Sequence, residues 1–184
     1  MNVEKAMQTF VRSLPNFLTS KFSGTVVEDL FIKLQSSKLI KRIRWQTTSL
    51  HESRFETPVG TISFDVPPDA GYATQRQYEP KAVAAFVQEL DVDSVVYDVG
   101  SRHGLYIELA KHFGIKPNQI HGFEADWFRY MVCNHNHASS GVVINHGYIG
   151  NGENDSITLD EYSELNSPPD VVKIDVEGAE KCVL

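Results

Sequence analysis

An aspartate and two glycines follow a short apolar run in the middle of the chain. Residues 95–97 (VVY) are typical of a buried β-strand, and the segment DVGSRHG after them contains Asp98, Gly100 and Gly104. Residues 105–113 then have the pattern of a helix. A strand, a glycine-rich turn and a helix in this order predict the first βα unit of a nucleotide-binding sheet.

The acidic residue at the end of this strand limits the kind of ligand. Dinucleotide folds place a phosphate at the N-terminus of the helix that follows, and the carboxylate of Asp98 would repel it. The glycines have the spacing G-x-x-x-G, whereas dinucleotide-binding turns have G-x-G-x-x-G. S-adenosylmethionine (SAM) has an ammonium and a sulfonium group and no phosphate, so an acidic strand end suits it. The alternative is a tight strand–helix turn without a ligand.

Three further strands are predicted after this turn. Residues 120–123 (IHGF) predict the second, and Glu124 after it is placed to bind ribose hydroxyls. Residues 142–145 predict the third strand and residues 171–175 (VVKID) the fourth. Lys173 within the fourth strand either pairs with a carboxylate or extends its charged end to solvent.

Helical segments alternate with these strands. Residues 81–90 predict a helix that has Pro80 in its first turn, and residues 126–138 predict one with Asp126 as N-cap. Residues 156–162 predict a shorter helical segment. This alternation of strand and helix predicts a doubly wound, Rossmann-like α/β sheet.

The first part of the chain is expected to be an extension, residues 1–76, before a cofactor-binding domain of residues 77–184. Residues 1–50 are mostly helical in pattern, and residues 61–66 predict a strand that pairs with residues 54–56. A basic cluster lies in the helical part: Lys33, Lys38, Lys41, Arg42 and Arg44. It is either a solvated helix face or a patch for peripheral contact with a membrane surface or an anionic glycan.

Composition indicates a soluble, cytoplasmic protein. Of 184 residues, 41% are hydrophobic and 22% charged, which is ordinary for a globular domain. No apolar run can span a bilayer, the start does not resemble a signal peptide, and two cysteines form no disulfide framework. The net charge is −7, and residues 81–184 hold 16 acidic against seven basic side chains. This half is therefore not expected to bind nucleic acid.

The histidines do not predict a metal site. His135 and His137 lie two positions apart on a helix and face apart. Cys133 and His137 share a face, but two ligands do not make a zinc site. His103, in the predicted cofactor turn, is either a proton acceptor or a plain turn residue.

The chain resembles the FkbM family of SAM-dependent methyltransferases in several segments, which occur in the same order. The resemblance covers roughly residues 78–184. Its segments are YEP (78–80), DVGSRHG (98–104), GFEA (122–125), TLD (158–160) and VVKIDVEGAE (171–180). The last is the most specific. The resemblance implies a class I methyltransferase fold and O-methylation of a hydroxyl group on a sugar or secondary metabolite, so the partner is a small-molecule or glycan acceptor.

The resemblance also assigns site residues. The SAM-binding positions are Asp98, Gly100, Ser101, Gly104, Glu124 and Gly147, with Glu124 at the ribose and Gly147 beside the adenine. Asp175 and Glu177 lie where substrate and methyl group meet, and each is a candidate for the base that accepts the hydroxyl proton. Alternatively, Asp175 orients the amino group of the cofactor and Glu177 caps the following helix.

The chain departs from the family at two places. Ser101 and Arg102 replace the usual small residue and Asn, and Arg102 either points outward or contacts the cofactor carboxylate. The chain also stops at Leu184, before the strands that end the family's sheet. We therefore expect a truncated sheet in which strand one lies between strands two and four, strand four is an exposed edge, and the chain self-associates with little methyl transfer.

Two other functions compete with methyl transfer. One is a nicotinamide-dependent oxidoreductase, which Asp98 and the glycine spacing disfavour. The other is a non-catalytic or truncated protein of the SAM-binding fold, which the early end favours.

Overall fold

The computed structural model describes residues 37–70, 76–152, 156–176, 178 and 180–183, and the chain divides into two compact units, Met1–Ser49 and Leu50–Leu184. In the first unit it describes helix α3 (Lys38–Thr47), which begins where Ser37 Oγ accepts a hydrogen bond from the Ile40 N–H. The helices predicted before it, and Lys33 of the basic cluster, lie outside the described residues. In the part of the chain that is described, no helix combines the length and the apolar character needed to span a membrane.

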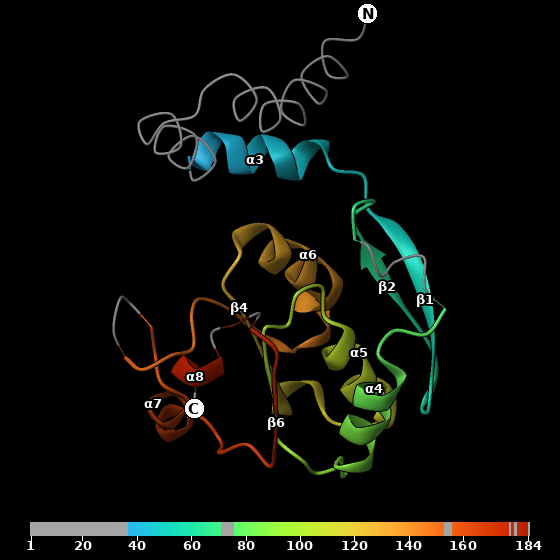
Figure 1. The fold of residues 1–184 in the computed structure, drawn as a ribbon, viewed down its shortest axis with the longest axis vertical. Helices are drawn as coiled ribbons and strands as arrows, with labels where there is room; N and C mark the ends of the chain where they lie inside the picture. The colour runs from blue at the N-terminus through green and yellow to red at the C-terminus, as the bar shows by residue number, and fades with distance from the viewer. Residues whose placement is uncertain (1–36, 71–75, 153–155, 177, 179, 184) are drawn as a thin grey trace, which may run out of the picture. The chain divides into compact units, whose positions relative to one another are not determined.

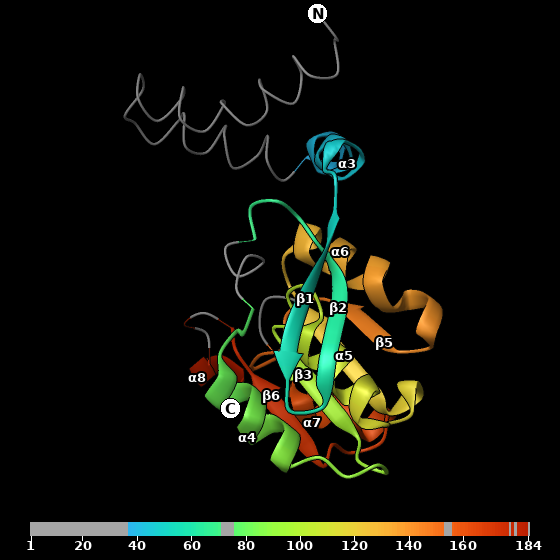
Figure 2. The same ribbon diagram turned by 90° about the vertical axis from the view of Figure 1, so that its right-hand side faces the viewer.

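A β-hairpin begins the second unit. Strands β1 (His51–Thr57) and β2 (Gly60–Val66) pair antiparallel, so the predicted hairpin is confirmed with a longer first strand. Side chains alternate across it, and the buried face includes Phe55 and Ile62. This face packs on α5 (Leu105–Phe113), as Figure 2 shows. The hairpin thus belongs to the compact unit of the sheet, whereas the sequence placed it in the extension of residues 1–76.

Four parallel strands form the central sheet. They are β3 (Val96–Val99), β4 (Ile120–Glu124), β5 (Val143–His146) and β6 (Val171–Ile174), in the order β5-β4-β3-β6. The predicted position of the first strand between the second and the fourth is therefore confirmed. The chain winds from β3 to β5 in one direction and then places β6 on the other side of β3. In open α/β sheets, ligands bind at the carboxyl ends of the strands where the winding reverses.

Helices cover both faces of this sheet (Figure 1). Helices α4 (Pro80–Gln88), α5 and α6 (Trp127–His137) lie with the hairpin over one face, and α7 (Leu159–Leu165) and α8 (Glu180–Val183) lie over the other. Short 3-10 turns, Pro117–Gln119 and Ala138–Ser140, precede β4 and follow α6. The result is a mixed α/β fold that is compatible with a Rossmann-like architecture.

Several predicted boundaries differ from the structure by one to three residues, and two of these differences concern the site or a helix cap. Strand β3 begins and ends later than residues 95–97, so that Asp98 lies within the strand. The helix predicted at residues 156–162 begins only at Leu159, because Thr158 is its N-cap. Thr158 and Glu161 form a reciprocal capping box, which sets this start.

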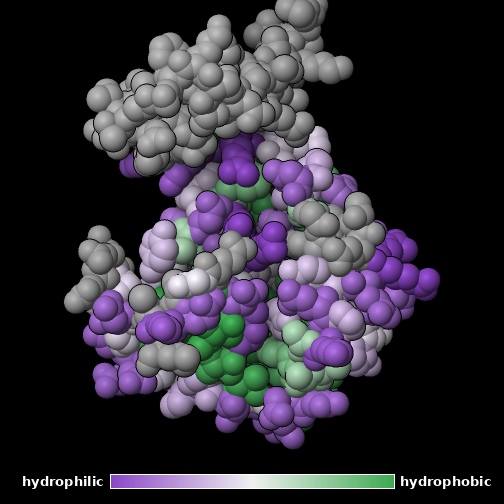
Figure 3. Space-filling view, in the orientation of Figure 1, coloured by the Kyte–Doolittle hydropathy of each residue, from purple (hydrophilic) through white to green (hydrophobic). Residues whose placement is uncertain are grey.

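Strand β6 is one edge of the sheet that the described residues form. Val172 is 39% exposed on it, and the space-filling view shows hydrophobic surface over this strand (Figure 3). An apolar edge strand is open to pairing with another chain. The self-association expected from the sequence stays a prediction.

Candidate functional site

The turn after β3 is held by both neighbouring strands. Gly100 (φ +80°) and Gly104 (φ +97°) have left-handed backbones that favour glycine. A Cβ on Gly100 would collide with the main-chain carbonyl of Asp175, directly after β6. On the other side, the N–H groups of Gly100 and Ser101 donate to the Phe123 carbonyl at 2.9 and 3.0 Å. The two glycines of the motif are therefore needed where the sequence analysis expected them.

Ser101 supports this turn with its side chain. Its buried hydroxyl donates to the Asp98 carbonyl at 2.7 Å and accepts a hydrogen bond from the Phe123 N–H at 2.9 Å. These bonds join the turn to β3 and β4. The hydroxyl thus acts within the protein, and the expected contact between Ser101 and a cofactor stays a prediction.

Asp98 forms an ion pair inside the protein. It is 0% exposed, and its Oδ1 lies 3.1 Å from the Nζ of Lys173. The two residues are register partners in the parallel strands β3 and β6, so their side chains emerge on the same face of the sheet. Lys173 also donates to the Gly100 carbonyl at 3.0 Å, and its ammonium lies 4.9 Å from the ring centroid of Tyr106. Of the two predictions for Lys173, pairing with a carboxylate is confirmed.

This ion pair changes the electrostatics at the strand end. Burial raises the pKa of Asp98, and the Lys173 charge opposes that rise. Asp175 Oδ2 lies 4.0 Å from Lys173 Nζ, and its side chain is 56% exposed. The carboxylates of Asp98 and Asp175 and the ammonium of Lys173 together carry one net negative charge. Of the two carboxylates, that of Asp175 is accessible to solvent. A cationic group of a ligand would therefore meet Asp175 rather than Asp98.

Glu124 ends the adjacent strand β4 and contacts the same turn. Its buried carboxylate accepts a hydrogen bond from the Arg102 N–H at Oε2 and one from the Asp126 N–H at Oε1, both at 2.8 Å. Burial raises the pKa of Glu124, and these two N–H groups oppose the rise. Each carboxylate oxygen retains a further lone pair, with which it can accept a hydrogen bond from a hydroxyl group.

Gly147 lies beside Glu124, after strand β5. Its N–H donates to the Glu124 carbonyl at 3.1 Å. A Cβ built on Gly147 would meet no atom of the described residues within 4 Å. The ring of the preceding His146 packs against Tyr130 at a tilt of 37°, with ring centroids 4.9 Å apart. The structure thus brings together the positions that the resemblance assigned to ribose and adenine.

Further residues, to which the sequence assigned no role, interact electrostatically with Asp175. Burial is the main cause that raises the pKa of Tyr78. The negative charges of Glu79 and Asp175 add to the rise and the positive charge of Arg102 opposes it, so these four groups are close enough to interact. Burial also raises the pKa of Tyr106, with further contributions from Glu79 and the acidic strand ends. The YEP segment of the resemblance drew attention to Tyr78 and Glu79, but no pattern in the neighbouring sequence predicted that they interact with Asp175.

The backbone is strained at two of these residues. Glu79 (φ +43°) and Arg102 (φ +53°) are the non-glycine residues with positive φ in the described part of the chain. Glu79 precedes Pro80, a position that normally favours extended backbone. Strained conformations of this kind cluster at functional sites. Both residues interact with Tyr78, which supports a site at this end of the sheet.

His103 does not add a base to this geometry. His103 is buried, and burial together with the charges of Arg102 and Arg129 lowers its pKa to about 4. Such an imidazole is neutral at pH 7 and a weak base, which makes it a poor match for deprotonating a hydroxyl. Glu177 lies outside the described residues.

Cys133 lies in α6 as a free, buried thiol. Burial raises its pKa, so the thiolate that a metal would require is disfavoured. Over the whole described part of the chain, no three His, Cys, Asp or Glu side chains are grouped so that they could hold a metal ion.

No family model, curated protein or solved structure matches this chain. The fold and the site are therefore defined by their own geometry. They comprise a parallel α/β sheet, a glycine-bracketed turn, and acidic residues at the carboxyl ends of three adjacent strands.

Proposed function

We propose that this chain is a SAM-dependent O-methyltransferase of the FkbM type. The observation that supports this most is the placement of Asp98, Glu124 and Asp175. They lie at the carboxyl ends of β3, β4 and β6, which are adjacent strands at the point where the winding reverses. The acceptor would be a hydroxyl group of a small molecule or glycan.

The backbone of the turn favours SAM over a dinucleotide. A phosphate at a helix N-terminus needs backbone N–H groups that point at it. Here the N–H groups of Gly100 and Ser101 donate to Phe123, that of Arg102 donates to Glu124, and that of Gly104 donates to the Ser101 carbonyl. These donors are used within the protein, so the turn offers them to no phosphate. These hydrogen bonds disfavour a nicotinamide cofactor whatever the charge of Asp98.

Each acidic residue would have a separate role. SAM supplies a methyl group that its sulfonium has already activated. The Glu124 carboxylate would accept hydrogen bonds from the ribose hydroxyls, and Asp175 would attract the ammonium group. Asp175 and Glu177 are the candidates for the base that removes the proton of the acceptor hydroxyl. The buried Asp98–Lys173 pair would hold the turn through the Gly100 carbonyl.

Titration calorimetry tests the cofactor class. We expect the full chain to bind S-adenosylhomocysteine (SAH), the product of methyl transfer, and not NAD⁺. Binding of NAD⁺ in preference to SAH would overturn the proposal.

A substitution at the expected ribose site tests the geometry. Glu124→Ala should weaken SAH binding by about 1.5–3 kcal/mol, the usual value of hydrogen bonds to a charged group. Because Glu124 also accepts bonds from Arg102 and Asp126, the thermal unfolding of the variant is measured in parallel. The exposed Glu164→Ala is the matched control. If the folded Glu124 variant binds SAH as the parent does, the ribose assignment is wrong.

A further inference from the structure

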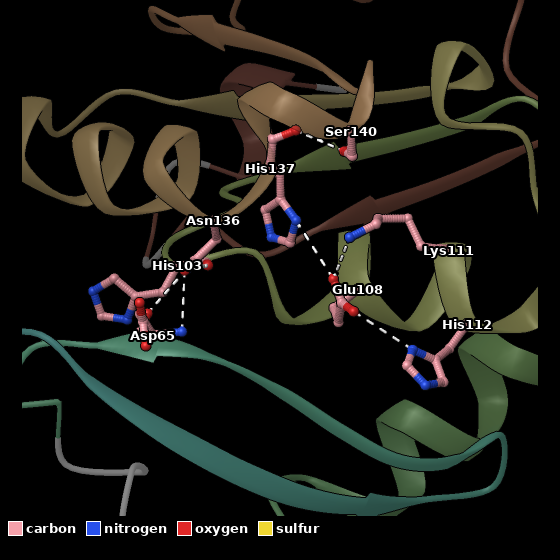
Figure 4. Close-up of polar contacts among 8 residues, drawn as sticks. All are labelled: Asp65, His103, Glu108, Lys111, His112, Asn136, His137 and Ser140. Atoms are coloured by element: carbon pink, nitrogen blue, oxygen red, sulfur yellow. Dashed lines mark hydrogen bonds and ion pairs between the residues drawn. The ribbon is translucent and has the colours of Figure 1, made fainter.

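The last turn of α6 contacts three separate parts of the fold (Figure 4). His135 Nε2 lies 3.1 Å from Asp65 Oδ2 in the hairpin. His137 is fully buried, and its Nδ1 lies 3.5 Å from Glu108 Oε2 on helix α5. Asn136, between them, reaches both the hairpin and the turn after β3. This segment, whose spacing predicts no metal site, joins the hairpin, the turn after β3 and helix α5.

Asn136 uses its whole side-chain amide at this junction. Its Oδ1 accepts a hydrogen bond from the Asp65 N–H at 3.0 Å, and its Nδ2 donates to the Asp65 carbonyl at 2.9 Å. The same Nδ2 donates to the His103 carbonyl at 3.0 Å. One side chain thus joins strand β2 to the cofactor turn. We call this set of three hydrogen bonds the Asn136 bridge.

The bridge requires an amide. It uses one acceptor and two donors at once, which asparagine supplies within a single planar group. Aspartate at this position would keep the acceptor but lose both donors, and its charge would face two carbonyl oxygens. Alanine would remove all three hydrogen bonds.

The bridge acts on the part of the turn that follows its hydrogen bonds to Phe123 and Glu124. Gly100 and Ser101 are tied to β4, and Arg102 is tied to Glu124. His103 comes after these anchors. Its carbonyl is held from the side of α6 by Asn136, and the Gly104 backbone that follows lies against the ring of His137.

We propose that Asn136 is a positioning residue for cofactor binding: it fixes the second half of the glycine turn against the hairpin β1–β2. This inference rests on the proposed function, because it assumes that the turn holds the cofactor. It assigns to the hairpin a role in binding that neither composition nor motif indicated. The hairpin then serves as a fixed support for residues 102–104, rather than only as a cover for α5.

The test compares Asn136→Ala with Asn134→Ala in the full chain. Asn134 has the same residue type on the same helix, and the structure shows no side-chain hydrogen bond for it among the described residues, so it is a matched control. Of the three hydrogen bonds that alanine removes, one reaches the turn, and its loss at about 1 kcal/mol corresponds to roughly a fivefold change. We expect about fivefold faster hydrogen exchange at the amides of residues 102–104, and about fivefold weaker SAH binding by the folded protein. Asn134→Ala should change neither quantity.

Asn136→Asp separates positioning from general stability. Protonation of the introduced carboxyl restores one donor, so its SAH affinity, relative to the wild type at the same pH, should rise as the pH falls from about 7 toward about 4. The two carbonyl oxygens that face this carboxyl disfavour its charged form, so the rise should begin above the usual Asp pKa of about 4. A merely structural role would leave the affinity of the folded variants equal to that of the wild type at each pH, and this result would overturn the proposal. If the wild-type chain binds no SAH, the proposed function fails. The exchange rates then still decide whether Asn136 fixes the turn.

Discussion

Replacing Lys173 by methionine should destabilise the domain by about 3–5 kcal/mol at neutral pH, the cost of leaving one partner of a buried ion pair unpaired. Asp98 is fully buried and the Lys173 side chain is only 13% exposed, so solvent can compensate little. Coulomb's law gives a similar size: two unit charges 3.1 Å apart, at an effective dielectric constant of about 20, interact by about 5 kcal/mol. Methionine has a comparable length, so the change removes the charge with little loss of volume.

The loss should depend on pH in a defined direction. Burial raises the pKa of Asp98 and Lys173 lowers it, so the variant has a higher Asp98 pKa than the wild type. A carboxyl whose pKa is higher in the folded than in the unfolded state binds protons preferentially when folded. The destabilisation that this carboxyl causes when it is charged therefore decreases as the pH falls through its folded-state pKa. The deficit of Lys173→Met relative to the wild type should shrink from about pH 7.5 to about pH 5.

Urea unfolding at these two pH values measures the effect. Asp98→Asn combined with Lys173→Met should recover most of the lost stability, because no buried charge remains. Lys81→Met, at an exposed lysine of α4, is the control for loss of a positive charge. A cost of less than about 1 kcal/mol for Lys173→Met, the range of a surface pair, would contradict a buried Asp98–Lys173 ion pair. A deficit that is the same at both pH values, together with no recovery in the double variant, would contradict it too.

Two further predictions concern the turn and the buried histidines. Gly104→Ala should cost more stability than Gly114→Ala by at least about 1 kcal/mol in urea unfolding. Both positions have positive φ, but only a Cβ on Gly104 would collide with the ring of His137, so equal losses would contradict this packing. Burial lowers the pKa of His137 to about 4, as it does for His103. The unfolded state therefore binds protons first, and stability should fall from about pH 6.5 to about pH 4, by up to roughly 3 kcal/mol for each histidine. His137→Gln should reduce this loss of stability at acid pH. An unchanged loss would show that His137 does not titrate as its burial predicts.

Much of the fold follows from local pattern. The helix predicted at residues 105–113 has those bounds in the structure, and Asp126 is the N-cap of α6, where it accepts a hydrogen bond from the Arg129 N–H. The strands at residues 120–124 and 171–174 were found from their apolar runs. Such elements are predictable because glycine, proline and capping residues act on their immediate neighbours.

The candidate site was only partly predictable. The acidic strand ends and the two turn glycines lie together as expected, because parallel strands end at one edge of the sheet. The sequence did not identify Lys173 as the partner of Asp98, because this pairing depends on the register between β3 and β6. Strand register comes from the packing of the whole sheet and not from either strand alone. The strained backbones of Glu79 and Arg102 likewise have no signal in their neighbouring residues.

The order of strands and helices, the hairpin, and the glycine-bracketed turn with its acidic neighbours could be predicted from the sequence. Each of these depends on interactions between residues close together in the chain. Three features became known only from the folded chain: Lys173 neutralises Asp98, Asp175 presents the accessible charge, and Asn136 holds the turn to the hairpin. Asn136 and Asp65 are 71 positions apart. Contacts over such distances form only when the hydrophobic faces of several elements pack together, because the gain from that packing offsets the entropy lost in closing the chain.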